Sequence, residues 1–224
     1  MRRSLSCGLL AALWAASPVA AQSQHPIADA GFGVCVPRSQ RAGHALGCFI
    51  VTDRPQPPLG PAPVFWHVTR FRSRAQAEAL RDSAATVIEA FGQVWLMTIG
   101  DSARQPGGGV PVATIGPLPI RPGVTYSALY MEASMLPGMK TPVHRHSGPE
   151  AWYTLRGETC LETPRGVQTG TATSAAVIAP GGLPMQLTAT GTAPRRSLVL
   201  ILHDAAQPPT VMDSTWTPRG LCAR

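Results

Sequence analysis

The sequence predicts a mostly β protein, with an antiparallel sandwich or barrel in its second half and a small β-α-β module before it. The first observation is that short β-rich runs recur between Pro/Gly turns at spacings near ten residues from Val110 onward. The second is that no helical pattern of useful length occurs in that part of the chain. The third is a capped, alanine-rich helical segment between two strand-like runs further upstream.

Residues 1–21 have the pattern of a cleavable export signal. Arg2 and Arg3 precede an apolar run at 5–16, and Val19-Ala20-Ala21 resembles a small-residue cleavage site. The apolar run is too short for a comfortable membrane span. We therefore expect a mature chain beginning at Gln22 that is periplasmic or extracellular, with no stable membrane insertion after cleavage.

The mature chain is only mildly basic. Removing the signal takes two arginines and no acidic residue from the 19 basic and 12 acidic residues, which leaves 17 and 12 and a net charge of +5. No Lys/Arg run or basic stripe with interleaved aromatic residues occurs, so we expect no nucleic-acid binding. A positive surface is compatible with an anionic small molecule or a loose association with an anionic envelope.

Four cysteines remain after the signal, at Cys35, Cys48, Cys160 and Cys222. An even number in an exported chain predicts two disulfides, and three pairings are open. We favour Cys35 with Cys48, because this pair closes a short loop worth about 3 kcal/mol. Cys160 with Cys222 would then attach the C-terminal tail, residues 211–224, to the main domain. Zinc ligation is the alternative, but no CxxC pair supports it.

Residues 22–63 are predicted to be a disulfide-containing segment and a Pro-rich linker. The stretch DRPQPPLGPAP, residues 53–63, cannot be helical, because each proline fixes its own backbone and restricts the residue before it. The linker is therefore expected to be extended and to lead into the small module.

Residues 64–109 are predicted to form the β-α-β module. A strand at 64–71 is followed by the capping-box pattern of residues 73–76, which opens a helix to about Ser83. A second strand-like run, 85–99, is interrupted by Gly92 and suggests a hairpin. Three glycines at 107–109 mark the end of the module. The module lacks a glycine-rich phosphate loop, so we expect it to cover the barrel mouth or mediate association.

Residues 110–210 are predicted to form the barrel. Alternating Val, Ile and Leu residues supply one core-facing side for each strand. The strand-like runs include Val124–Met131, Ala151–Leu155, Ala175–Ile178 and Ser197–Leu202.

The stretch GMKTPVHRHSGPEAWYTLRG, residues 138–157, carries the predicted chemistry. On a strand, His144 and His146 project from the same face, and a turn at 147–149 allows Glu150 to return a carboxylate toward them. The same alternation places Trp152 and Thr154 on the Glu150 face, where they would line a pocket.

The spacing of this stretch resembles the first motif of the cupin superfamily. The pattern is Gly138, five residues, His144-x-His146, three residues, Glu150, six residues and Gly157. The resemblance covers about residues 110–203 and implies a single-domain cupin, a double-stranded β-helix or jelly-roll barrel. It also implies a divalent metal ion held inside the barrel by the two histidines and the glutamate, and a homodimer as the expected assembly.

The second motif implied by the resemblance is incomplete. Pro180-Gly181-Gly182 supplies its turn, but Met185 occupies the position where a fourth ligand, a histidine, is expected, and Ser174 replaces a glycine. Met185 is interpreted as an apolar pocket wall, with ligation of a soft ion such as Cu(I) as the alternative. If residues 190–194 form a hairpin, His203 lies too far along its strand to replace the missing ligand.

Two functions follow as hypotheses. The first is an exported metal-binding barrel that acts as an oxygenase, isomerase or lyase on a small molecule, with Fe, Mn, Zn or Ni as the ion. The second is a non-catalytic small-molecule-binding or structural protein of the cell envelope with weak or no metal. Neighbours considered for catalysis beside Trp152 and Thr154 are Tyr126, Tyr130 and Glu132, depending on strand register.

Overall fold

The computed structural model describes residues 35–104 and 107–222. The predicted export signal and the first part of the segment at 22–63 lie outside the described residues. Within the described residues, no helix has the length and apolar character needed to cross a membrane.

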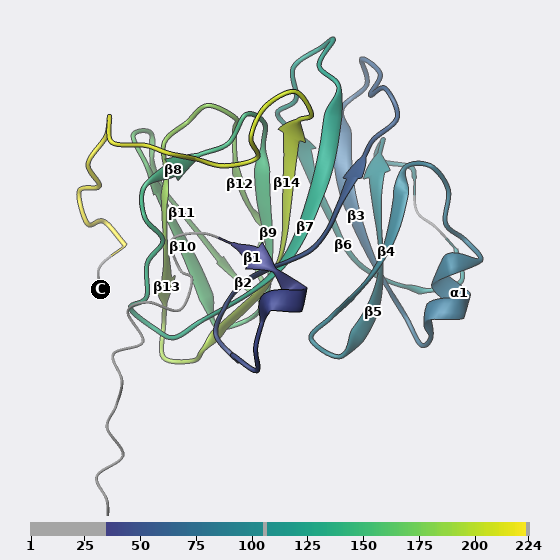
Figure 1. The fold of residues 1–224 in the computed structure, drawn as a ribbon, viewed down its shortest axis with the longest axis horizontal. Helices are drawn as coiled ribbons and strands as arrows, with labels where there is room; N and C mark the ends of the chain where they lie inside the picture. The colour runs from purple at the N-terminus through teal and green to yellow at the C-terminus, as the bar shows by residue number, and fades with distance from the viewer. Residues whose placement is uncertain (1–34, 105–106, 223–224) are drawn as a thin grey trace, which may run out of the picture.

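The chain forms three layers of β-sheet, with a six-stranded sheet in the middle (Figure 1). The middle sheet has the order β1-β2-β7-β14-β9-β12, and it contains β1 (Val36–Pro37), β2 (Gly47–Pro55), β7 (Tyr126–Met135), β9 (Glu150–Arg156), β12 (Val177–Ala179) and β14 (Arg195–Asp204). One outer layer holds β10 (Glu158–Thr163), β11 (Gly166–Thr171) and β13 (Gln186–Thr190), with the short pair β8 (His144–Arg145) and β15 (Val211–Met212). The other outer layer holds β3 (Val64–Phe71), β4 (Ala85–Ala90), β5 (Gln93–Gly100) and β6 (Val110–Leu118), with helix α1 (Arg74–Glu78).

The eight consecutive strands β7 to β14 form a jelly roll. Four of them are neighbours in the order β7-β14-β9-β12 within the middle sheet. The other four follow the order β8-β13-β10-β11, in which the backbone bridges Lys140↔Thr188 and His144↔Met185 link the β8 region to the segment around β13. Successive strands alternate between the two sheets except at β10 and β11, which form a hairpin within the outer sheet, and this is the double Greek-key arrangement of the barrel. The predicted fold class is confirmed.

The middle sheet is covered on both faces around β7 and β14, which explains why β7 is buried along its whole length. Tyr126 and Tyr130 pack against the outer layer that contains β3. Leu129 and Met131 point to the opposite side, into the barrel. The same alternation continues along β9 and β14, because successive side chains of a strand point to opposite faces. The middle sheet therefore contributes side chains to two separate hydrophobic cores, one inside the barrel and one against the smaller sheet.

The smaller sheet is wholly antiparallel, in the order β4-β5-β3-β6. Its hairpin turns at Phe91 and Gly92, whose φ angles of +52° and +71° suit the tight turn between twisted strands. The Ser73 hydroxyl accepts the Gln76 backbone N–H at 3.3 Å, as expected for the helix cap, but α1 ends at Glu78, before the expected end near Ser83. Strand β6, expected to open the barrel, pairs with β3 instead, so it lies in the smaller sheet.

The segment before residue 63 takes part in the middle sheet. Strand β2 pairs with β7 along most of its length and extends into the expected linker as far as Pro55. Cys35 is joined to Cys48, the pairing that we favour from the sequence. Arg41 forms an ion pair with the buried Glu132 carboxylate, which anchors the loop between β1 and β2.

The C-terminal tail is fastened to the barrel at several points. Cys222 is joined to Cys160. The buried Glu162 carboxylate accepts the backbone N–H groups of Arg219 at 2.5 Å and Leu221 at 2.9 Å. Earlier in the tail, β15 pairs with β8. These contacts hold residues 209–212 against the strand that carries His144.

Candidate metal centre and cavity

Short backbone links place the two histidines and the glutamate. His144 lies on β8 and exchanges backbone hydrogen bonds of 3.1 and 2.9 Å with Met185. The turn after His146 needs glycine at 148, because a Cβ atom there would lie 2.0 Å from the Leu202 carbonyl oxygen. Glu150 then begins β9, and its side chain points into the barrel.

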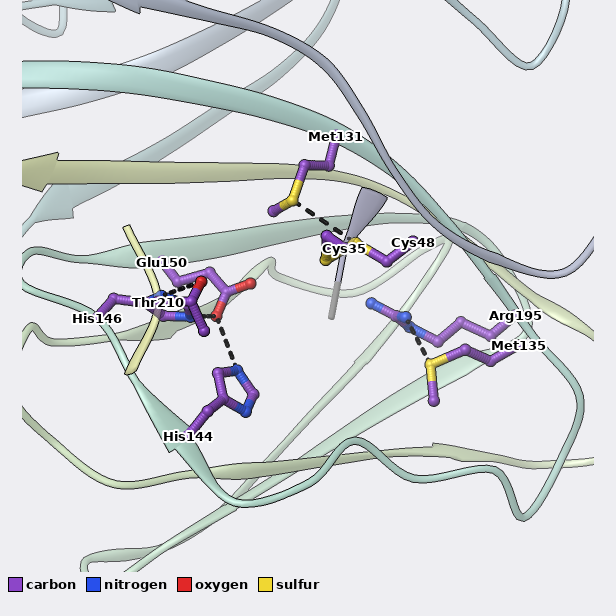
Figure 2. Close-up of a disulfide and its surroundings, with 9 residues drawn as sticks. All are labelled: Cys35, Cys48, Met131, Met135, His144, His146, Glu150, Arg195 and Thr210. Atoms are coloured by element: carbon purple, nitrogen blue, oxygen red, sulfur yellow. Dashed lines mark hydrogen bonds and ion pairs between the residues drawn. A yellow bond between two sulfur atoms is a disulfide. The ribbon is translucent and has the colours of Figure 1, made fainter. Parts of the chain in front are cut away.

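The three side chains converge as the sequence predicts (Figure 2). Nε2 of His146 lies 2.7 Å from Oε2 of Glu150, and Nε2 of His144 lies 3.9 Å from the same oxygen. One potential ligand atom from each residue falls within 4.8 Å of the other two. All three residues are buried, which is uncommon for polar groups without a structural or chemical partner.

Backbone carbonyls fix the orientation of both imidazoles. Nδ1 of His144 lies 2.9 Å from the Pro142 carbonyl oxygen, and Nδ1 of His146 lies 2.6 Å from that of Pro209. A carbonyl oxygen only accepts, so each Nδ1 carries a proton and donates it. In the neutral rings, Nε2 is therefore left with a lone pair, and both lone pairs face the interior. This is the support that metal-ligating histidines usually have.

The residues fit a bound cation. Nε2 of His146 and Oε2 of Glu150 are buried and lack a well-aligned hydrogen-bond partner among the described residues, despite their short separation. Two atoms that both offer lone pairs repel each other unless a proton or a cation lies between them. Two imidazole nitrogens and one carboxylate also form a ligand set typical of Zn²⁺ and of non-haem Fe²⁺.

Charges inside the barrel influence one another strongly. Burial alone would raise the pKa of Glu150, but the neighbouring His146 and His144 lower it to about 2. Burial lowers the pKa of His144, and its contact with Glu150 outweighs that effect, so the pKa is raised overall. Burial lowers the pKa of Arg195 to about 10, against the attraction of Glu150. A carboxylate and a guanidinium are therefore both charged near neutral pH.

A cavity of about 300 Å³ opens beside the three residues. Its walls are mostly apolar, and Trp152 is among them as predicted. The described lining residues are Cys35, Gly47, Cys48, Ile50, Leu129, Met131, Ala133, Met135, Thr141, Pro142, His144, His146, Glu150, Trp152, Leu187, Arg195, Val199, Ile201, Pro209, Thr210 and Met212. This composition, apolar with a few converging polar groups, is typical of a small-molecule site.

Two pocket candidates from the sequence do not belong to this described lining. Thr154 is on the inward face, but it is buried behind the wall, where its hydroxyl contacts that of Thr159 at 3.0 Å. Met185 is fully buried in the barrel core. Because it pairs directly with His144, its side chain lies on the same face of the sheet. It therefore occupies the place that the resemblance assigns to a fourth ligand.

Three further candidates face away from the cavity. Tyr126 and Tyr130 belong to the core between the middle sheet and the smaller sheet. Glu132 lies on the same face and accepts the Phe91 backbone N–H at 3.0 Å, besides its ion pair with Arg41. Side chains 126, 130 and 132 all project from the face of β7 that points away from the barrel, and the sequence alone did not fix this register.

The conditional hairpin at residues 190–194 is wrong, because β13 pairs with β10 and β14 pairs with β7 and β9. The conclusion drawn from it for His203 nevertheless agrees with the structure. His203 is buried away from the cavity lining, and its Nε2 lies 3.1 Å from a carboxylate oxygen of Asp53. Its role is a structural contact between β14 and β2.

Sequence reasoning missed two contributors to the site. Arg195 begins β14 and lines the cavity with a fully buried guanidinium. Pro209 supplies the carbonyl that orients His146, from a position 63 residues later in the chain. An arginine two residues before the predicted strand at 197–202 is a signal that could have been followed. The Pro209 contact has no sequence pattern, because it depends on the path of the tail.

No protein-family profile and no curated protein matches the sequence. Solved structures resemble a part of it. A double-stranded β-helix protein from Klebsiella pneumoniae has 16% identity and a TM-score of 0.34, over 43% of this chain and 87% of that one. A cupin-like protein from Thermotoga maritima has 14% identity and a TM-score of 0.35, over 38% and 64%. A DMSP lyase from Ruegeria pomeroyi has 23% identity and a TM-score of 0.33, over 38% and 42%.

The strand order and the site together define the class of protein. Strands β7 to β14 form a jelly-roll barrel whose interior holds a buried group of two histidines and one glutamate. These three residues occupy the fixed positions of the first cupin motif. His144 begins β8, His146 follows β8 directly, and Glu150 begins β9. The chain therefore has the cupin fold, with an additional four-stranded sheet packed on the outside of its barrel.

Proposed function

We propose that the protein binds a divalent metal ion through His144, His146 and Glu150 and presents it to a small molecule in the barrel cavity. The observation that carries this proposal is the close approach of two buried atoms, Nε2 of His146 and Oε2 of Glu150, that have no well-aligned hydrogen-bond partner among the described residues. They belong to a group whose imidazoles are held with Nε2 facing inward. Metal binding would satisfy both atoms and offset the desolvation of the carboxylate.

A bound ion would supply Lewis acidity at positions that the three protein ligands leave open. The chain itself contributes orientation and water exclusion. The carbonyls of Pro142 and Pro209 hold the two rings, and Trp152 and its aliphatic neighbours keep the cavity apolar. Near neutral pH such a site suits oxygenase, isomerase or lyase chemistry on a small molecule, and this is the class that we propose. Fe, Mn, Zn and Ni all accept this ligand set.

The second candidate is a non-catalytic cupin that binds a small molecule or has a structural role in the cell envelope. Met185 supports it, because a fully buried thioether replaces the fourth ligand implied by the resemblance. Losing one ligand weakens retention of hard divalent ions. The two candidates differ in whether the purified protein holds metal tightly.

We further propose that the protein is exported. Both disulfides join residues of the folded domain, which fits an oxidising compartment, and residues 1–21 have the pattern of a cleavable signal. A homodimer stays an expectation from the resemblance.

The direct test is elemental analysis of the mature protein purified without a metal-affinity tag. We expect close to one divalent ion per chain in the wild type and little in a His144→Ala/His146→Ala variant. His44→Ala is the matched control, because it removes an exposed imidazole that does not line the cavity. Equally low metal in the wild type and the double variant, after incubation with each candidate ion, would favour the non-catalytic alternative.

A further inference from the structure

Arg195 carries a charge that no carboxylate in the described part of the chain pairs. Its side chain is fully buried at the cavity wall, and no carboxylate of the described residues contacts it. Nε donates to the Thr159 hydroxyl at 2.6 Å, and Nη1 lies 3.3 Å from the Met135 sulfur. Nη2 has no protein partner among the described residues. Burying an unpaired guanidinium is costly, so a partner of opposite charge is expected.

The guanidinium is also held in a fixed orientation. The Thr159 hydroxyl that accepts from Nε lies 3.0 Å from the Thr154 hydroxyl, which Ser197 contacts at 3.5 Å. Gly157 packs directly on the Arg195 backbone, where a Cβ atom would lie 2.7 Å from the Arg195 Cα. Neutral oxygen atoms thus fix one edge of the guanidinium and leave its far end open. Figure 2 shows that end pointing toward Glu150 and the two histidines.

The charge inside the cavity favours an anionic ligand. With a divalent ion bound, neutral imidazoles, one carboxylate and one guanidinium leave two net positive charges in an apolar enclosure. A water molecule can satisfy Nη2 but cannot neutralise this charge. A carboxylate is planar and matches the end of a guanidinium through two parallel hydrogen bonds, and it can carry the apolar body that the mostly apolar walls suit.

We propose that Arg195 anchors the carboxylate of the small molecule that occupies the cavity, with the remainder of that molecule extending toward the metal centre. This inference deepens the proposed function and rests on it for the metal end of the ligand. The cavity volume of about 300 Å³ corresponds to about ten non-hydrogen atoms. The apolar walls, including Leu129, Val199 and Ile201, suit an aliphatic or aromatic body. The ligand class is therefore a small carboxylic acid with an apolar body.

The test compares binding of straight-chain carboxylates, from acetate to octanoate, with binding of the corresponding primary amides. Titration calorimetry is carried out on the zinc-loaded and the metal-free protein. We expect the acids that fit to bind at least about tenfold more tightly than their amides, since charge-assisted hydrogen bonds are the stronger ones. Equal affinity of acids and amides, or no binding of either series, overturns the inference.

Two variants separate the anchor from a structural role. Arg195→Met removes the buried charge with an apolar side chain of comparable length, and it should abolish the preference for acids while leaving metal content unchanged. The matched control is Arg196→Met, which removes the same charge from an exposed side chain on the opposite face of β14. An acid preference that persists in Arg195→Met, or is lost equally in Arg196→Met, contradicts the proposal.

The outcome is distinguishable from failure of the proposed function. If the protein holds no metal, the comparison of acids with amides on the metal-free protein still decides whether Arg195 is an anchor. If it holds metal but shows no preference for acids, the metal centre stands and the anchor fails. If Arg195→Met does not fold, the wild-type comparison decides by itself.

Discussion

Replacing both cysteines of the Cys160–Cys222 disulfide by serine should destabilise the protein strongly without disturbing the metal centre. The bond spans 62 residues, and a loop of that length corresponds to about 4 kcal/mol in the chain-entropy description. The Cys35–Cys48 bond spans 13 residues and corresponds to about 3 kcal/mol. The contacts of Glu162 with the tail remain in the variant, so the folded tail keeps its path.

The metal centre should be insulated from this change because the carbonyl that orients His146 is held locally. Strand β15 stays paired with β8, and Arg145 donates to the buried Asp213 carboxylate at 2.7 Å. We therefore expect metal affinity within about threefold of the wild type, well short of the roughly 10–100-fold loss that follows removal of a supporting contact.

Urea denaturation of the Cys160→Ser/Cys222→Ser variant, compared with Cys35→Ser/Cys48→Ser and the wild type, measures the stability change. Competition with a chelator measures the metal affinity. A loss of stability below about 1 kcal/mol would refute the reasoning about the tail. A loss of metal affinity of about tenfold or more would refute the insulation of the site.

Three further predictions concern the barrel. Met185→His should tighten metal binding by about tenfold or more in chelator competition, because it restores a fourth ligand beside the site; unchanged affinity would show that position 185 does not reach the ion. Gly148→Ala should lower the free energy of unfolding by about 3 kcal/mol and reduce metal content, since its Cβ would meet the Leu202 carbonyl oxygen at 2.0 Å. The control Gly60→Ala places its Cβ in open space and should change neither quantity. Glu132→Gln weakens the buried ion pair with Arg41 and should lower stability by about 2 kcal/mol in urea denaturation, with metal content unchanged. A loss of metal would contradict the position of Glu132 on the face of β7 that points away from the barrel.

The part of the site that the sequence predicted is the part with local spacing. His144, His146 and Glu150 lie within seven residues, so strand alternation and one turn were enough to bring them together. Trp152 followed from the same alternation. The predicted strands at 124–131, 151–155 and 197–202 were recovered as β7, β9 and β14, because each combines aromatic or β-branched residues with flanking turn residues.

The remaining features depend on pairings between distant segments. Strand β2 joins β7 across more than 70 residues, and β6 turns back to β3, so neither partner could be deduced from local pattern. Arg195 begins a strand that is buried on both faces, and alternation alone does not say which face opens into a cavity. We expected the small module to cover the barrel mouth or mediate association. In the structure it covers the outer face of the middle sheet instead.

We propose that His144, His146 and Glu150 hold one divalent ion. A crystal structure of the protein soaked in Zn²⁺, with anomalous diffraction recorded on both sides of the zinc absorption edge, tests this proposal most directly. We predict one strong anomalous peak about 2.0–2.2 Å from Nε2 of both histidines and from a Glu150 carboxylate oxygen. An interior without an anomalous peak at these residues at saturating Zn²⁺, or a peak held by other side chains, would contradict it.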